Sequence, residues 1–313
     1  MPPIHEVALL TLPQAHALAG FCASSYVGIL YLLQQTRITY SSESAEGQAK
    51  ERARRRDDSD VIRARLIAVS ISTIVSCSVV VGTIWHTSGN EPLSSAASFA
   101  ATLLGFTTHW HIFLSCLIAP VLYAGPLYTS FLSSSLPFQQ FWSFESNVKP
   151  IFSTWVGWRN CIVAPLTEEV VFRACVLAIY HLAGVSSKKL IFLSPLWFGL
   201  AHVHHGWEVY HRLGRTAQAV QTAVVSVVFQ LAYTTLFGFH CAYLFLKTGS
   251  LVPALVSHIF CNIMGLPGFG SDVAQFPHRR VAIILAYVGG MLGYIYTLSA
   301  WTKGFDSPYW LSM

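Results

Sequence analysis

Long stretches of this chain contain no charged residue, and short polar segments separate them. Asp, Glu, Lys and Arg are absent from residues 7–36, 66–90, 92–144, 216–246, 248–271 and 281–302. A membrane-spanning helix needs about 20 mainly apolar residues, so each run predicts one span, and 92–144 has room for two. The apolar segments around Glu168 and over 190–207 add further helices. The pattern therefore predicts an all-α, polytopic membrane protein with about eight transmembrane helices.

Turn residues inside these runs predict where individual helices end. The run 92–144 is expected to cross the membrane up to about Tyr123 and to continue as a re-entrant or interfacial piece. The helix that carries Glu168 is expected to end before Gly184, and Gly238 marks a possible break in a later span. Glycine favours such places because it lacks a Cβ atom.

Composition excludes a soluble multi-domain protein, because only 11% of the residues are charged and 53% are hydrophobic, whereas a soluble domain has about 25% charged residues. The net charge is +5, and the basic residues concentrate in residues 37–65, which hold eight of the nineteen Lys and Arg residues. The positive-inside rule predicts that this loop is cytosolic. We expect a solvated loop rather than a lipid or partner patch, and no nucleic-acid partner.

The segment from Pro165 to Arg173 places two adjacent carboxylates and an arginine in apolar sequence. Charges are costly in such a segment, so they indicate function. Pro165 suits the first turn of a helix. On that helix Glu169 and Arg173 stand four residues apart and are predicted to form an ion pair. Glu168 lies about 100° around the helix, so it is predicted to do chemistry instead.

Two later helices carry polar pairs at the same spacing. Phe198 and His202 share one helix face, and so do His258 and Asn262. Taken alone, each pair is more typical of interhelical hydrogen bonding than of catalysis. Together with Glu168 they form the set that peptide hydrolysis needs: a carboxylate and an imidazole to activate water, and an imidazole and an amide to bind an oxyanion.

Other kinds of site stay open from the residues alone. Carboxylate and imidazole also bind zinc, but no His-Glu-x-x-His motif occurs, and the spacing of His202, His204 and His205 is poor for one ion on a single helix. We therefore predict neither a metal nor another cofactor. A non-enzymatic membrane scaffold and a proton-coupled transporter are the alternatives to a hydrolase.

These motifs resemble one known family. Glu-Glu-x-x-x-Arg from Glu168, Phe-x-x-x-His ending at His202 and His-x-x-x-Asn from His258 occur in the order found in the intramembrane CAAX-protease family, which also includes bacteriocin-immunity-type homologues. The resemblance covers roughly residues 150–265. It implies a multi-pass protein of the endoplasmic reticulum membrane that removes the last three residues of prenylated CaaX proteins, such as small GTPases.

The resemblance also implies roles for the motif residues. Glu168 and His202 would activate the water, His258 and Asn262 would form the oxyanion hole, and the glutamate–arginine pair would support the site. A prenyl chain partitions into lipid while the scissile peptide bond needs water, so we expect the helices to enclose an intramembrane polar cavity. The bilayer and prenylated proteins are the expected partners.

The chain is expected to have two regions. Residues 1–149 would form N-terminal transmembrane helices with the charged cytosolic loop, and residues 150–313 would form the catalytic region.

Overall fold

The computed structural model describes residues 8–39, 54–89, 91–107 and 112–310. Residues 40–53 of the predicted cytosolic loop therefore lie outside the described residues. The chain forms two compact units, each built from two separate stretches: residues 1–104 with 166–243, and residues 105–165 with 244–313.

The described residues are mainly helical, which confirms the predicted all-α class. Among the described residues, four segments are long and apolar enough to cross a membrane: α1 (Leu12–Leu32), α2 (Ser59–Thr87), α14 (Ala217–Thr248) and Pro277–Ala300, which contains α17 (Arg280–Ala300). The pair α15 (Val252–Met264) and α16 (Phe269–Gln275), bent by 48°, would be a fifth span. The protein is thus a multi-pass membrane protein, and the larger number of about eight spans stays a prediction.

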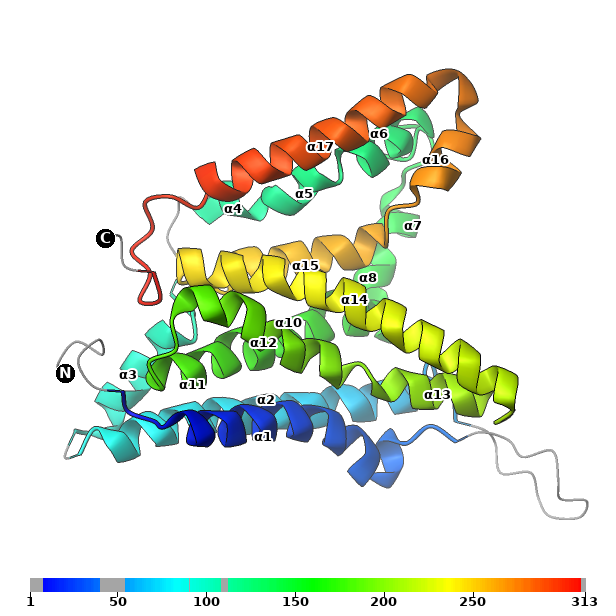
Figure 1. Cartoon of the computed structure of the whole chain (residues 1–313). Helices are drawn as coiled ribbons and strands as arrows, with labels where there is room; N and C mark the ends of the chain where they lie inside the picture. Colours follow the sequence, from blue (N-terminus) through cyan, green and yellow to red (C-terminus); the bar gives the residue numbers. More distant parts are fainter. Residues whose placement is uncertain (1–7, 40–53, 90, 108–111, 311–313) are drawn as a thin grey trace, which may run out of the picture. The chain divides into compact units, whose positions relative to one another are not determined.

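The first unit is organised around one fully buried helical segment. Every residue from 170 to 182 is buried, and this stretch comprises the π-helical turn η4 (Val170–Cys175) and α11 (Val176–Leu182). Helix α1 packs beside α2 and against α11 and α12 (Ser187–Ala201), while η4 contacts α2 and α12 (Figure 1). This unit also contains the 3-10 helix η1 (Gln34–Thr36), α3 (Leu93–Leu103), most of α10 (Ala164–Glu169), α13 (His204–Arg212) and most of α14.

Two glycines in the first unit show how backbone geometry shapes these helices. Helix α11 ends at Leu182, and Gly184 has a φ of 71°, which confirms the predicted end. The predicted break at Gly238 is wrong, because α14 is one helix of 32 residues. A Cβ at Gly238 would lie 2.7 Å from Cβ of Pro195 in α12, so this glycine permits close helix packing instead.

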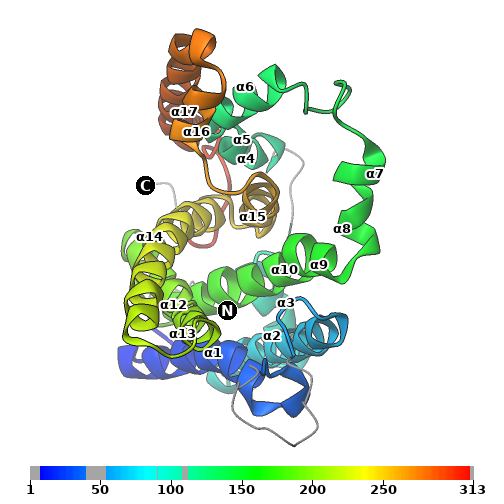
Figure 2. The ribbon, with the colours of Figure 1, turned by 90° about the vertical axis from the view of Figure 1, so that its right-hand side faces the viewer.

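The second unit contains two groups of helices. Helix α17 packs along α5 (Ile118–Leu122) and α6 (Ala124–Leu132), with α16 against it (Figures 1 and 2). Helix α15 contacts α4 (Phe113–Cys116), α5 and the π-helical turn η3 (Arg159–Val163). The short helices α7 (Phe144–Asn147), α8 (Lys149–Ser153) and α9 (Trp155–Trp158) lead into η3.

The predicted continuous span from residue 92 to Tyr123 is wrong. Helix α3 ends at Leu103, and Gly105 follows with a φ of 69°. The carbonyl of Gly105 accepts a hydrogen bond from the Leu251 amide (3.0 Å), and a Cβ there would lie 2.6 Å from the Phe245 ring. This close approach requires glycine in a left-handed conformation, and such a conformation cannot continue a right-handed helix.

Candidate functional site

The helical run that carries Glu168 is longer and less regular than predicted. It continues from Trp155 through η3, α10 (Ala164–Glu169), η4 and α11 to Leu182. Pro165 therefore lies inside the run, and its predicted place in a first turn is wrong. Proline removes a helical hydrogen bond and crowds the carbonyl four residues earlier, and the π-helical turn η3 lies directly before it. Such turns are frequent at functional sites.

The predicted ion pair between Glu169 and Arg173 is confirmed. Arg173 Nε lies 3.3 Å from Glu169 Oε2, and the two side chains are 1% and 0% exposed. The guanidinium carbon of Arg173 also lies 3.9 Å from the centroid of the Phe198 ring. A desolvated cation over an aromatic face gains about 2 kcal/mol. The pair therefore connects the buried segment to α12 through the ring of Phe198.

His202 comes immediately after Ala201, the last residue of α12, and is half-buried. Its Nδ1 lies 2.7 Å from the carbonyl oxygen of Phe198. Because a carbonyl oxygen can only accept a hydrogen bond, Nδ1 must carry the proton. The neutral ring then has its lone pair on Nε2, the atom that a general base uses. The Phe198 ring meets the His202 ring edge-on, with centroids 4.6 Å apart, so Phe198 contacts both His202 and Arg173.

Glu168 lies between two buried residues in the last turn of α10. Thr167 is buried, and its hydroxyl is hydrogen-bonded to the hydroxyl of Tyr26 in α1 (2.9 Å). Glu168 itself is half-buried and interacts electrostatically with Tyr26 and with Tyr233 of α14. The residues on either side of Glu168 are thus fixed by contacts with other side chains, while the Glu168 side chain itself stays partly exposed.

His258 and Asn262 lie in the second unit, four residues apart on α15. His258 is buried, whereas Asn262 is exposed and donates from Nδ2 to the carbonyl oxygen of Asn160 (2.8 Å). Asn160 belongs to η3. An amide nitrogen has two hydrogens, so this bond orients the Asn262 side chain and leaves a second hydrogen for another acceptor.

The first unit contains four of the predicted residues, Glu168, Glu169, Arg173 and His202, and Phe198 links the ion pair of Glu169 and Arg173 to His202. The other two belong to the second unit, so the convergence of all six on one site stays a prediction.

Sequence reasoning missed His240 of α14. This residue interacts electrostatically with Glu169 and Arg173, so it belongs to the surroundings of the buried ion pair. It lies in the charge-free run 216–246, which was used only to predict a membrane-spanning helix. A histidine within a long apolar helix is the signal that could have found it.

A second polar cluster lies on α13. Ligand atoms of His204, His205 and Glu208 all lie within 4.8 Å of one another, which makes this trio a candidate cation site. Arg65 of α2 contacts Glu208 at 3.5 Å. Burial raises the pKa of the Glu208 carboxyl, but the hydrogen bond to His205 and the charges of His205 and Arg65 outweigh burial and lower this pKa to about 2. From the sequence, these histidines were considered as metal ligands only together with His202, as a set with poor spacing for one ion, and Glu208 was not included.

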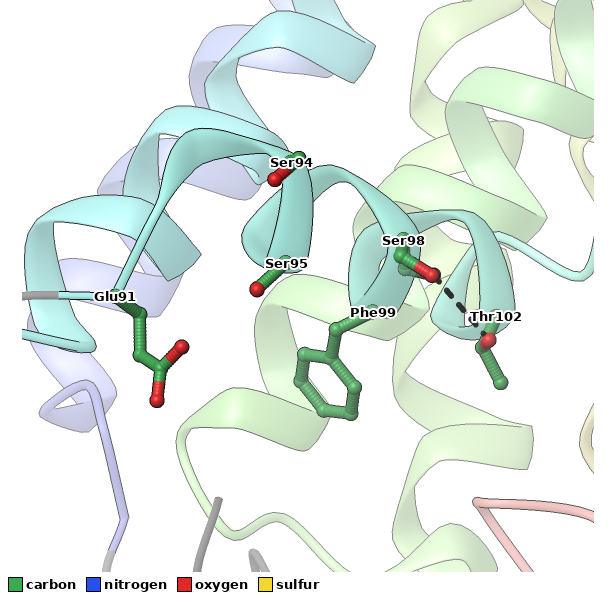
Figure 3. A pocket seen from close by; sticks show the side chains of 6 residues that line it. All are labelled: Glu91, Ser94, Ser95, Ser98, Phe99 and Thr102. Atoms are coloured by element: carbon green, nitrogen blue, oxygen red, sulfur yellow. Dashed lines mark hydrogen bonds between the residues drawn. The ribbon is translucent and has the colours of Figure 1, made fainter.

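A surface hollow on α3 contains none of the predicted residues. It has a volume of about 620 Å³ and is lined by Glu91, Ser94, Ser95, Ser98, Phe99 and Thr102 (Figure 3). The Ser98 carbonyl accepts a hydrogen bond from the Thr102 hydroxyl (3.3 Å), which is an ordinary contact within a helix. The carboxylate of Glu91 is the single charged group among these lining residues, and no histidine or cation lies beside it there, so we assign the hollow no role.

Comparison with known proteins yields one family. Residues 150–264 match the family described as Type II CAAX prenyl endopeptidase Rce1-like. The probable CAAX prenyl protease 2 of Schizosaccharomyces pombe is 34% identical over 243 residues, which cover 77% of this chain and 81% of that protein. CAAX prenyl protease 2 of Homo sapiens is 32% identical over 272 residues, with 82% and 72% covered. The Arabidopsis thaliana protein of that name is 39% identical over 161 residues, 49% of each chain. No solved structure matches the chain.

Proposed function

Because the chain belongs to the CAAX prenyl protease 2 family of peptide hydrolases, we propose that it removes the C-terminal tripeptide from prenylated CaaX proteins in the endoplasmic reticulum membrane. Small GTPases are the proposed substrates. One observation carries the mechanism: His202 binds the Phe198 carbonyl through Nδ1 (2.7 Å), so Nε2 has the lone pair of a base. This supports water activation by the His202 imidazole together with the Glu168 carboxylate.

The reaction begins when Glu168 and His202 take a proton from water and its oxygen attacks the scissile carbonyl carbon. The carbonyl π electrons move onto oxygen, and hydrogen bonds from His258 and Asn262 stabilise the resulting oxyanion. As the oxyanion collapses, the C–N bond breaks, and the proton taken from water passes to the leaving amine. The products are a shortened prenylated chain that ends in a carboxylate and a free tripeptide.

The buried pair of Glu169 and Arg173 has a positioning role in this mechanism. Its ion pair and the contact of Arg173 with Phe198 hold the segment after Glu168 against α12, which leads to His202. A site held from two elements in this way keeps its groups close to a productive geometry.

The proposal extends to the surroundings of the site. About eight transmembrane helices would enclose a polar cavity that admits both the lipid chain and water. Residues 1–149 would supply N-terminal helices and the cytosolic loop at 37–65, and residues 150–313 would form the catalytic region.

A cleavage assay tests this function directly. Purified protein is mixed with a farnesylated CaaX peptide or with the same peptide without its lipid, and the products are identified by mass spectrometry. We expect release of the intact C-terminal tripeptide from the farnesylated peptide, and much less from the other. If folded protein binds the farnesylated peptide and releases nothing, the chain acts as a scaffold and the hydrolase proposal is wrong.

Asn262→Asp is expected to lower kcat for this cleavage by about 10²–10³-fold, the loss typical of one oxyanion donor. Aspartate has nearly the same shape but its carboxylate cannot donate a hydrogen bond, so KM should change little. Asn147→Asp, an exposed amide on α7, is the matched control and should cleave normally. A normal kcat for Asn262→Asp would remove Asn262 from the oxyanion hole.

A further inference from the structure

We propose that His204, His205 and Glu208 bind one divalent cation of the zinc class. This site is separate from the proposed hydrolytic residues, and the inference does not depend on the proposed function. Ligand atoms of the three residues lie within 4.8 Å of one another on consecutive turns of α13. Three protein ligands of the His2Glu type leave a position for water on a tetrahedral ion.

The histidine geometry suits metal binding. His204 Nδ1 lies 2.6 Å from the Ala201 carbonyl oxygen, so Nδ1 carries the proton and Nε2 has the lone pair that a metal requires. A hydrogen bond of this kind from a ligating imidazole to a backbone carbonyl fixes the ring and its tautomer. The rings of His204 and His205 are adjacent, with centroids 4.0 Å apart.

Glu208 is the third ligand, and its present contacts are long. Its Oε2 lies 3.4 Å from His205 Nδ1, and its Oε1 lies 3.5 Å from Arg65 Nη2. Both distances are at the outer limit of a hydrogen bond, so a cation would replace weak contacts rather than strong ones. Arg65 itself is held by its Nε–H bond to the Thr36 carbonyl (2.8 Å). Arg65 thus lies on the side of one carboxylate oxygen of Glu208, while the other carboxylate oxygen faces His205.

Helix α13 packs closely against α14 beside these ligands. A Cβ at Gly206, between the ligands, would lie 2.3 Å from Cγ2 of Val227 in α14, so the two helices touch at this glycine. Pre-positioned ligands bind metal more tightly because less conformational freedom is lost.

The donor set selects the class of ion. Two imidazoles and one carboxylate suit Zn²⁺, Co²⁺, Ni²⁺ or Cu²⁺, whereas Ca²⁺ and Mg²⁺ prefer oxygen ligands. His202 is not part of the set, because it is not among the residues whose ligand atoms lie within 4.8 Å of one another, and its ring centroid is 5.8 Å from that of His205.

Titration with Co²⁺ tests the site without measuring cleavage. Protein without an affinity tag is treated with a chelator, freed of it and titrated with Co²⁺ while its visible spectrum is recorded. We expect d–d bands of a low-coordinate Co²⁺ ion that saturate at one equivalent per chain and disappear when one equivalent of Zn²⁺ is added. Zn²⁺ should also raise the midpoint of thermal unfolding, because it binds only the folded chain.

Single variants locate the ion. His204→Gln, His205→Gln and Glu208→Gln should each weaken Co²⁺ binding by about 10-fold or more, the effect of losing about 1.4 kcal/mol or more of binding free energy. His211→Gln, on the same helix, is the matched control and should bind normally. His202→Gln should also bind normally, which separates this site from the proposed water-activating pair.

Three results would overturn the proposal. They are the absence of a saturable band in the wild-type chain, unchanged bands in the three ligand variants, and loss of the bands in His202→Gln. If a ligand variant does not fold, the wild-type titration and the two control variants still decide the question.

Discussion

Glu168→Gln is expected to lower the rate of tripeptide release from a farnesylated CaaX peptide by about 10²–10⁴-fold, the usual contribution of a general base. Glutamine has the shape of glutamate but cannot take a proton from water. Since Glu168 is half-buried and the ion pair next to it involves Glu169, the substitution should leave the fold intact. The measurement is the cleavage rate at saturating substrate, with thermal unfolding as the check on folding.

The matched control is Glu145→Gln, which changes an exposed glutamate on α7 and should cleave at the wild-type rate. Each protein is also assayed with a strong chelator. Wild-type cleavage that survives chelation supports water activation by Glu168 and His202. Cleavage that stops with the chelator and returns with Zn²⁺ would contradict this mechanism, as would a Glu168→Gln variant with normal activity.

Arg173→Met is expected to cost about 3–5 kcal/mol of the free energy of unfolding, the typical loss when one partner of a buried ion pair is removed. Both side chains of the Glu169–Arg173 pair are at most 1% exposed, so water cannot replace the arginine next to the carboxylate. The loss of the guanidinium contact with Phe198 adds to the cost. The measurement is the unfolding transition of the purified protein in detergent.

A second pair with the same spacing is the control. Glu145 and Lys149 also stand four residues apart and are 2.7 Å from each other, but their side chains are 72% and 55% exposed. Lys149→Met should therefore cost no more than about 1 kcal/mol. In the double variant Glu169→Gln/Arg173→Met we expect part of the stability to return, because no charge then remains in the buried pair. Equal losses for Arg173→Met and Lys149→Met would show that burial does not govern the cost.

Local spacing predicted several local contacts and helix positions correctly. Residues four apart on a helix face the same way, so the ion pair of Glu169 and Arg173 could be derived from the sequence and is confirmed. The shared helix of His258 and Asn262 and the helix end before Gly184 follow from equally local rules. These features depend on residues that are neighbours along the chain.

Other features depend on segments that are far apart along the chain. Gly238 looked like a helix break but lets Pro195 approach α14 closely. Another glycine, Gly105, follows the end of helix α3, and its carbonyl accepts a hydrogen bond from the Leu251 amide. A glycine permits several conformations, so its neighbours in space decide which one it takes.

The sequence by itself determined that the protein is a helical membrane protein and which polar residues interrupt its apolar helices, because hydropathy and helical spacing are properties of adjacent residues. Only the tertiary structure decided how deeply the Glu169–Arg173 pair is buried, that Phe198 contacts both Arg173 and His202, and that Arg65 reaches Glu208 beside two histidines. These contacts join different helices. They depend on how side chains from distant segments fill the same space, and no pattern along the chain specifies that.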